Sequence, residues 1–109
     1  MMNQLYMEMI RYYSGDAKRI QHFVKVHAFA KLISELEHVD DRTKEIIETA
    51  ALVHDIGIRP AEEKYGTSSG KLQEQEGPAA AQAMLTRLGT DERLTDRVCY
   101  LVGHHHTYT

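Results

Sequence analysis

The chain of 109 residues is poor in the residues that constrain a fold covalently or rigidly: it has one cysteine, two prolines and no tryptophan. A single cysteine excludes an intrachain disulfide and fits a reducing compartment, so we expect a cytoplasmic protein. No apolar stretch has the length of a membrane span, so no membrane partner is expected. The net charge of −3 lacks the basic excess of nucleic-acid-binding proteins, which argues against a nucleic acid polymer as partner.

Helical periodicity is the main pattern that the sequence does contain. Apolar residues recur at helical spacing and strand alternation is missing, which predicts an all-α fold, a bundle of about five main helices in one domain of residues 1–109. The expected helices cover residues 2–13, 17–37, 42–55, 78–88 and a last segment capped by Thr90 and Asp91. Residues 58–75 contain Pro60, Gly66 and Gly70 and are expected to form a loop.

The adjacent pair His54-Asp55 is the most informative feature of the sequence. It closes an apolar helical run and is followed by Ile56-Gly57. An imidazole next to a carboxylate suits a divalent metal ion such as Mn, Fe, Co, Mg, Zn or Ni. Gly57 is expected to supply the left-handed residue that ends the helix.

Two residues on the helix of residues 17–37 are further candidates. His22 shares a helical stripe with Val26 and Ala30, close to the side that is expected to face the core, so it is a candidate metal ligand. The alternative for His22 is a core histidine with satisfied hydrogen bonds, and for His27 this is the favoured interpretation. Arg19 lies one turn before His22 and could bind phosphate with two parallel hydrogen bonds, or lie on a solvated helix face.

The second half of the chain adds a carboxylate and a histidine run. Glu76 is expected to open a helix rich in alanine, where the alternative role is that of a first-turn acid. His105 continues the stripe of Val98 and Val102 and is the best candidate for an inward ligand, with His104 second. The alternative for both histidines is a frayed polar C-terminus.

Together these residues resemble the HD-domain superfamily of metal-dependent phosphohydrolases, over about residues 16–107. The pattern R-x-x-H-x-x-x-V-x-x-x-A is met by Arg19, His22, Val26 and Ala30, and the family's dipeptide is His54-Asp55 within ALVHDIG. EGPAAA resembles the family's HxPxGA segment, with Glu76 in place of the histidine, and VCYLVGHHHT resembles its IxxH segment. The resemblance implies an HD-like helical bundle.

The resemblance also implies a ligand set and a reaction. His22, His54 and Asp55 would bind one divalent metal ion, and Glu76 with His105 and His104 would bind a second. The substrate would be a small-molecule phosphate ester, with a nucleotide expected, and Arg19 and Asp55 would be catalytic: Arg19 would orient the phosphate and Asp55 could bridge the metals.

Two departures from the family pattern bear on this interpretation. The family has a closing aspartate ligand downstream of the histidine run, and the chain as given lacks it, so we expect a domain that is incomplete at its C-terminal end. Many two-metal members have lysine directly after HDIG, where this chain has Ile58.

Two other functions stay open. Some HD-like proteins are di-iron oxygenases, and histidine with carboxylate suits iron equally well. A non-catalytic regulatory domain that binds metal or nucleotide would explain the missing aspartate. A homo-oligomer that forms through the apolar first helix is a further expectation.

Overall fold

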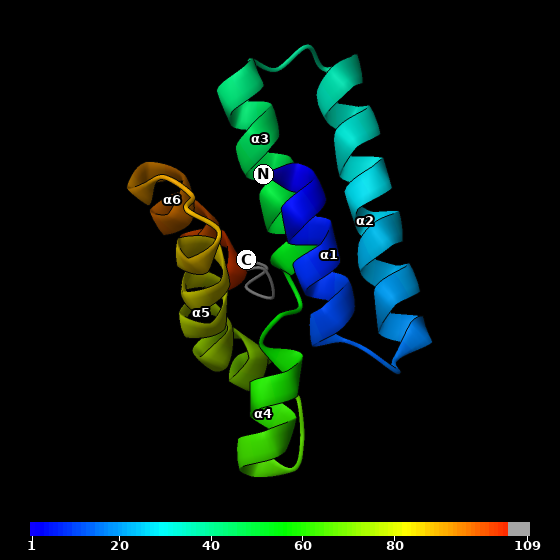
Figure 1. Cartoon of the computed structure of the whole chain (residues 1–109), viewed down its shortest axis with the longest axis vertical. Coiled ribbons are helices and arrows are strands. Elements are labelled where there is room, and N and C mark those ends of the chain that lie inside the picture. The colour runs from blue at the N-terminus through cyan, green and yellow to red at the C-terminus, as the bar shows by residue number, and fades with distance from the viewer. Residues whose placement is uncertain (105–109) are drawn as a thin grey trace. The chain divides into compact units, whose positions relative to one another are not determined.

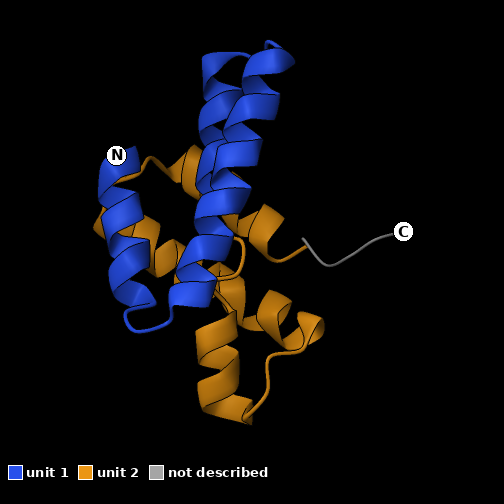
Figure 2. Cartoon of the chain, turned by 90° about the vertical axis from the view of Figure 1, so that its right-hand side faces the viewer, with its two compact units in different colours: residues 1–53 blue, residues 54–109 orange. Residues whose placement is uncertain are grey.

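The computed structural model describes residues 1–104, and every regular element in that range is an α-helix (Figure 1). The all-α prediction is therefore confirmed. The helices are α1 Met2–Tyr12, α2 Ala17–Leu36, α3 Asp41–Val53, α4 Ile58–Tyr65, α5 Gly70–Arg87 and α6 Glu92–Val102. They belong to two compact units, Met1–Val53 and His54–Thr109, which Figure 2 shows in two colours. Within the described range, no helix combines the length and the apolar character that crossing a membrane requires.

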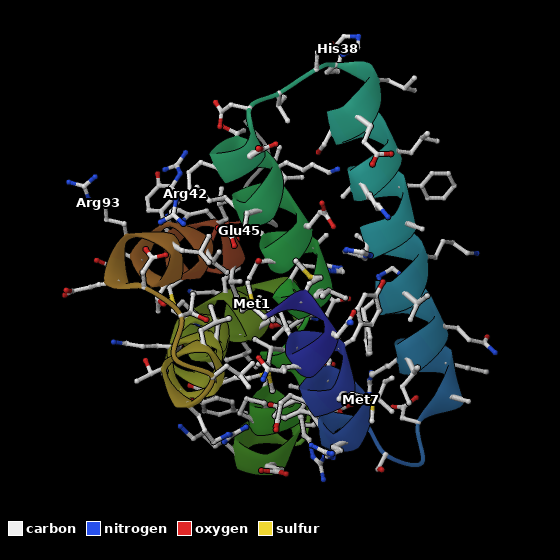
Figure 3. The ribbon with its side chains drawn as sticks, turned by 45° about the horizontal axis from the view of Figure 1, so that its top comes forward. Met1, Met7, His38, Arg42, Glu45 and Arg93 are labelled. Carbon is white, nitrogen blue, oxygen red and sulfur yellow. The ribbon has the colours of Figure 1, made fainter. Side chains whose placement is uncertain are left out.

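The first unit contains α1, α2 and α3, with α2 and α3 side by side and α1 against α3 (Figure 1). Leu5 and Met9 of α1 are completely buried, as their helical spacing predicts. Asp16 begins α2 by accepting a hydrogen bond from the backbone N–H of Arg19 at 3.2 Å. The turn between α2 and α3 contains His38, which has a positive φ of 53° and lies at the far tip of the unit (Figure 3).

Helix α2 exposes several large apolar side chains. Val24, Leu32 and Ile33 are 39%, 50% and 57% exposed, whereas Phe23 is almost fully buried. Apolar residues occur on both sides of this helix, so their periodicity alone does not identify the side that packs. The neighbouring helices decide this, and they cover the side with Phe23 and His27.

In the second unit, residues 58–75 do not form the loop that we expected. Helix α4 occupies Ile58–Tyr65, and Pro60 lies in its first turn, where the missing N–H costs no hydrogen bond. Gly66 ends α4 with a left-handed φ of 72°. The residues that disfavour helices therefore mark the ends of a short helix.

Helix α5 begins eight residues earlier than the sequence pattern predicted, at Gly70 and not at Pro78. Its cap is Ser69, whose hydroxyl accepts a hydrogen bond from the N–H of Leu72 at 3.4 Å. As a result, Glu76 does not open a helix but lies in the interior of α5, beyond its first turn. Helix α5 packs against both α4 and α6.

Gly57 does not have the left-handed conformation that we expected. Its φ of −74° is right-handed, and it precedes α4 as its N-cap. Glycine is required by a close approach instead: a Cβ atom here would lie 2.3 Å from the carbonyl oxygen of Gln73 and 2.9 Å from the nitrogen of Gly77. The turn before α4 therefore lies directly against the backbone of α5.

Candidate metal centre

His54 and Asp55 lie in the turn that joins α3 to α4. Helix α3 ends at Val53, two residues earlier than predicted, so the pair is placed by the turn and not by a helix end. The turn is fixed by the completely buried side chain of Ile56 and by the hydrogen bond from the N–H of Ile58 to the carbonyl of Asp55, at 3.1 Å. The side chains of His54 and Asp55 keep 19% and 18% of their surface exposed. They are held in place but remain accessible to an ion.

The two side chains of this pair converge. His54 Nε2 lies 3.1 Å from Asp55 Oδ2. Bonds from nitrogen and oxygen ligands to a divalent ion are about 2.0–2.2 Å long, which places neighbouring ligand atoms of one ion roughly 3 Å apart. The separation and the chemistry of the pair therefore fit two adjacent ligands of a single divalent ion.

His22 is exposed on α2 in the first unit, not close to the core as the sequence pattern indicated. It lines a hollow together with Lys18, Gln21 and Lys25. Two imidazoles and a carboxylate are a donor set that suits a divalent metal ion. The turn of the second unit supplies one imidazole and the carboxylate, and the addition of His22, which belongs to the first unit, stays a prediction.

His27 has the structural role that was favoured for it. It is 7% exposed, its Nδ1 contacts the hydroxyl of Tyr6, and its Nε2 lies 2.9 Å from Glu48 Oε1. Both ring nitrogens are thus occupied by protein partners, which leaves none for a metal ion. Burial, followed by the charge of Glu48, raises the pKa of Tyr6 and keeps its hydroxyl protonated as a donor.

Arg19 is held by the residue that caps its own helix. Its guanidinium donates to Asp16 Oδ2 at 2.9 Å, while Asp16 Oδ1 accepts from the Arg19 backbone. This ion pair was not expected from the sequence. The i, i+3 spacing of an acid and a base within one helical turn was the signal for it.

Glu76 is engaged by two residues of α4. It accepts hydrogen bonds from Lys64 Nζ at 2.7 Å and from the hydroxyl of Tyr65 at 3.2 Å. The hydrogen bond from Lys64 lowers the pKa of the Glu76 carboxyl and raises the pKa of the Lys64 ammonium. Neither partner was expected from the sequence, because both belong to α4, which the sequence pattern did not predict. The role of Glu76 as a metal ligand stays a prediction.

His104 is exposed and follows Gly103, the residue that caps the C-terminal end of α6, whereas His105 lies outside the described residues. The ring of His104 stacks on Tyr100, and its Nδ1 lies 2.6 Å from the carbonyl oxygen of Tyr100. A carbonyl can only accept, so Nδ1 is the protonated nitrogen. In the neutral ring Nε2 then has the lone pair that a metal ion requires.

Residues 19–109 of the chain match the family model of the HD domain. No curated protein and no solved structure matches the sequence. The matched span covers more than half of the chain and contains Arg19, His22, the pair His54-Asp55 and Glu76.

Proposed function

Because the chain belongs to the HD domain family, we propose that it is a metal-dependent phosphohydrolase that cleaves a phosphate ester, with a nucleotide as the expected substrate. HD domains typically bind divalent metals and act as hydrolases, so the family supports the general class of reaction. The observation on which the proposal depends is the turn of the second unit. It holds His54 Nε2 and Asp55 Oδ2 3.1 Å apart and partly open to solvent.

In this proposal, His22 joins His54 and Asp55 as the third ligand of one divalent ion. Two neutral imidazoles and one carboxylate suit Mn, Fe, Co, Mg, Zn or Ni. An ion bound there supplies Lewis acidity, which makes water a stronger acid and neutralises charge on phosphoryl oxygens. Asp55 has a second carboxylate oxygen, which gives it the capacity to bridge to a neighbouring ion.

Arg19 orients the phosphate group of the substrate, and Asp16 acts as its positioning residue. The guanidinium has five N–H donors in a planar arrangement that matches two phosphate oxygens. Its hydrogen bond from Nη1 to Asp16 Oδ2 fixes the direction of the group. Arg19 also lies one helical turn from His22, so both side chains point from the same part of α2.

A second ion, if one binds, is assigned to Glu76, His104 and His105. The proton on His104 Nδ1 supports this assignment because it leaves Nε2 as the ligand atom. Glu76 must exchange its hydrogen bonds with Lys64 and Tyr65 for a metal bond, which lowers the expected affinity of this site.

The test is hydrolysis of a panel of nucleotides by the purified protein in Mn²⁺, Co²⁺ or Mg²⁺. We expect release of phosphate or nucleoside that requires added metal. Because residues that only support a ligand already contribute about 10–100-fold, Asp55→Ala should lower turnover by more than about 100-fold. Asp96→Ala, at an exposed position on α6, is the matched control and should keep full activity. Folded protein without metal-dependent turnover, or an active Asp55→Ala variant, would contradict the proposal.

A further inference from the structure

A hollow of about 430 Å³ lies along the exposed side of α2 and is lined by Lys18, Gln21, His22 and Lys25. All four side chains are exposed, and all four can donate hydrogen bonds. Two of them are ammonium groups, and none of the lining residues within the described range 1–104 is a carboxylate. The lining therefore suits an anion.

The spacing along α2 places the lysines on either side of His22. Lys18, His22 and Lys25 stand at positions i, i+4 and i+7, so they share one helix face. At 1.5 Å per residue, the two lysines are separated by about 10 Å along the helix axis. Lys18 therefore lies roughly one helical turn before His22, and Lys25 lies roughly one turn after it.

The two ammonium groups also lack the compensation that other basic residues of this unit have. Arg19 is paired with Asp16, and Lys44 is paired with Glu35 at 2.9 Å. Within residues 1–104, no acidic side chain forms an ion pair with Lys18 or Lys25. A bound anion would supply the opposite charge that neither ammonium group receives from an acidic side chain.

We propose that Lys18, Gln21 and Lys25 form a subsite for a chain of two or three phosphate groups, so that the substrate is a nucleoside diphosphate or triphosphate. The position of these phosphate groups beside the reacting phosphate rests on the proposed function, in which His22 is a metal ligand. One phosphate monoester carries about −1.5 to −2 charges at neutral pH, whereas a di- or triphosphate extends its charge along its length and can reach both lysines. Lysine binds phosphate as a point charge on a flexible stem, and the amide of Gln21 adds two N–H donors between the lysines.

The experiment measures anion binding to metal-free protein, by calorimetry in EDTA at low and fixed salt. Inorganic pyrophosphate and tripolyphosphate should bind more tightly than orthophosphate. Lys18→Gln and Lys25→Gln should each weaken pyrophosphate binding about three- to fivefold, the range expected for one exposed charge. Lys31→Gln is the matched control because Lys31 is exposed on the same helix but does not line the hollow, and it should leave pyrophosphate binding unchanged. Circular dichroism checks that all variants stay helical.

Three results would overturn the subsite. In the first, orthophosphate binds as tightly as pyrophosphate. In the second, Lys31→Gln weakens binding as much as the other variants, which indicates a general charge effect. In the third, an oligoglutamate peptide binds and pyrophosphate does not, which indicates an acidic protein partner. Failure of the proposed function would appear separately, as wild-type protein without metal-dependent turnover, because the binding assay contains neither metal nor a reaction.

Discussion

His27 Nε2 lies 2.9 Å from Glu48 Oε1 in the interior of the first unit. An ionised carboxylate can only accept, so Nε2 donates, and Nδ1 then accepts from the hydroxyl of Tyr6. This buried chain of three polar side chains links α1, α2 and α3. It fixes the helix on which His22 and Arg19 lie, and it satisfies every hydrogen-bonding atom of the His27 ring.

Replacing Glu48 with alanine tests how much this buried hydrogen-bonded group of three side chains contributes to the stability of the fold. The buried N–H of His27 would lose its acceptor, so the free energy of unfolding should fall by about 1–3 kcal/mol. Urea denaturation followed by circular dichroism measures the change. Glu45→Ala is the control on the same helix: Glu45 pairs with Arg42 at the surface (Figure 3), and exposed pairs contribute about 0.2–1 kcal/mol. Equal losses for the two variants would show that the buried chain has no special role.

Gly57→Ala tests the close contact between the turn of residues 54–57 and α5. A Cβ atom there would collide with the backbone of Gln73, which cannot move without displacing α5. Overpacking of this kind typically costs about 1–3 kcal/mol, so we expect destabilisation of at least this size together with weaker metal binding. Gly66→Asn is the control, because Gly66 has open space around it and asparagine tolerates a positive φ. If Gly57→Ala is as stable as the wild type, this contact is not a constraint.

Local features of the sequence predicted the all-α fold. The caps Asp16 and Asp91 and the buried stripe of α1 depend on residues a few positions apart, which a sequence displays directly. The exposed side of α2 could not be predicted, because tertiary packing selects which of two apolar sides is covered. The partners of Glu76 depend on α4, a helix so short that Pro60 and Gly66 concealed it.

The pair of Lys64 and Glu76 makes a prediction about pH. The hydrogen bond and the charge of Lys64 lower the pKa of Glu76, so this pair stabilises the fold above the usual pKa of glutamate. That contribution is lost as the pH falls through the lowered pKa. Lys64→Met should therefore raise the pKa of Glu76 in an NMR titration. At neutral pH the variant should also have a lower free energy of unfolding than the wild type, because it lacks the contribution of this pair.

The same variant bears on the second metal ion. If Glu76 is a ligand, Lys64→Met should strengthen binding of that ion, and Glu76→Gln should cancel the gain when the two changes are combined. A gain that survives in the double variant would show that Lys64 acts only through its charge and that Glu76 is not a ligand.

The most direct test of the central claim is titration of metal-free protein with Mn²⁺, Co²⁺ or Zn²⁺, followed by calorimetry, for single alanine variants of His22, His54 and Asp55. Each variant should lose more than about 100-fold in affinity, and double variants should be little worse than single ones, because ligands of one ion act together. His38→Ala, at an exposed position on the α2–α3 turn, should bind metal like the wild type. Wild-type protein that binds no divalent ion, or a His22→Ala variant that binds as tightly as His38→Ala, would contradict the assignment of these three residues to one metal site.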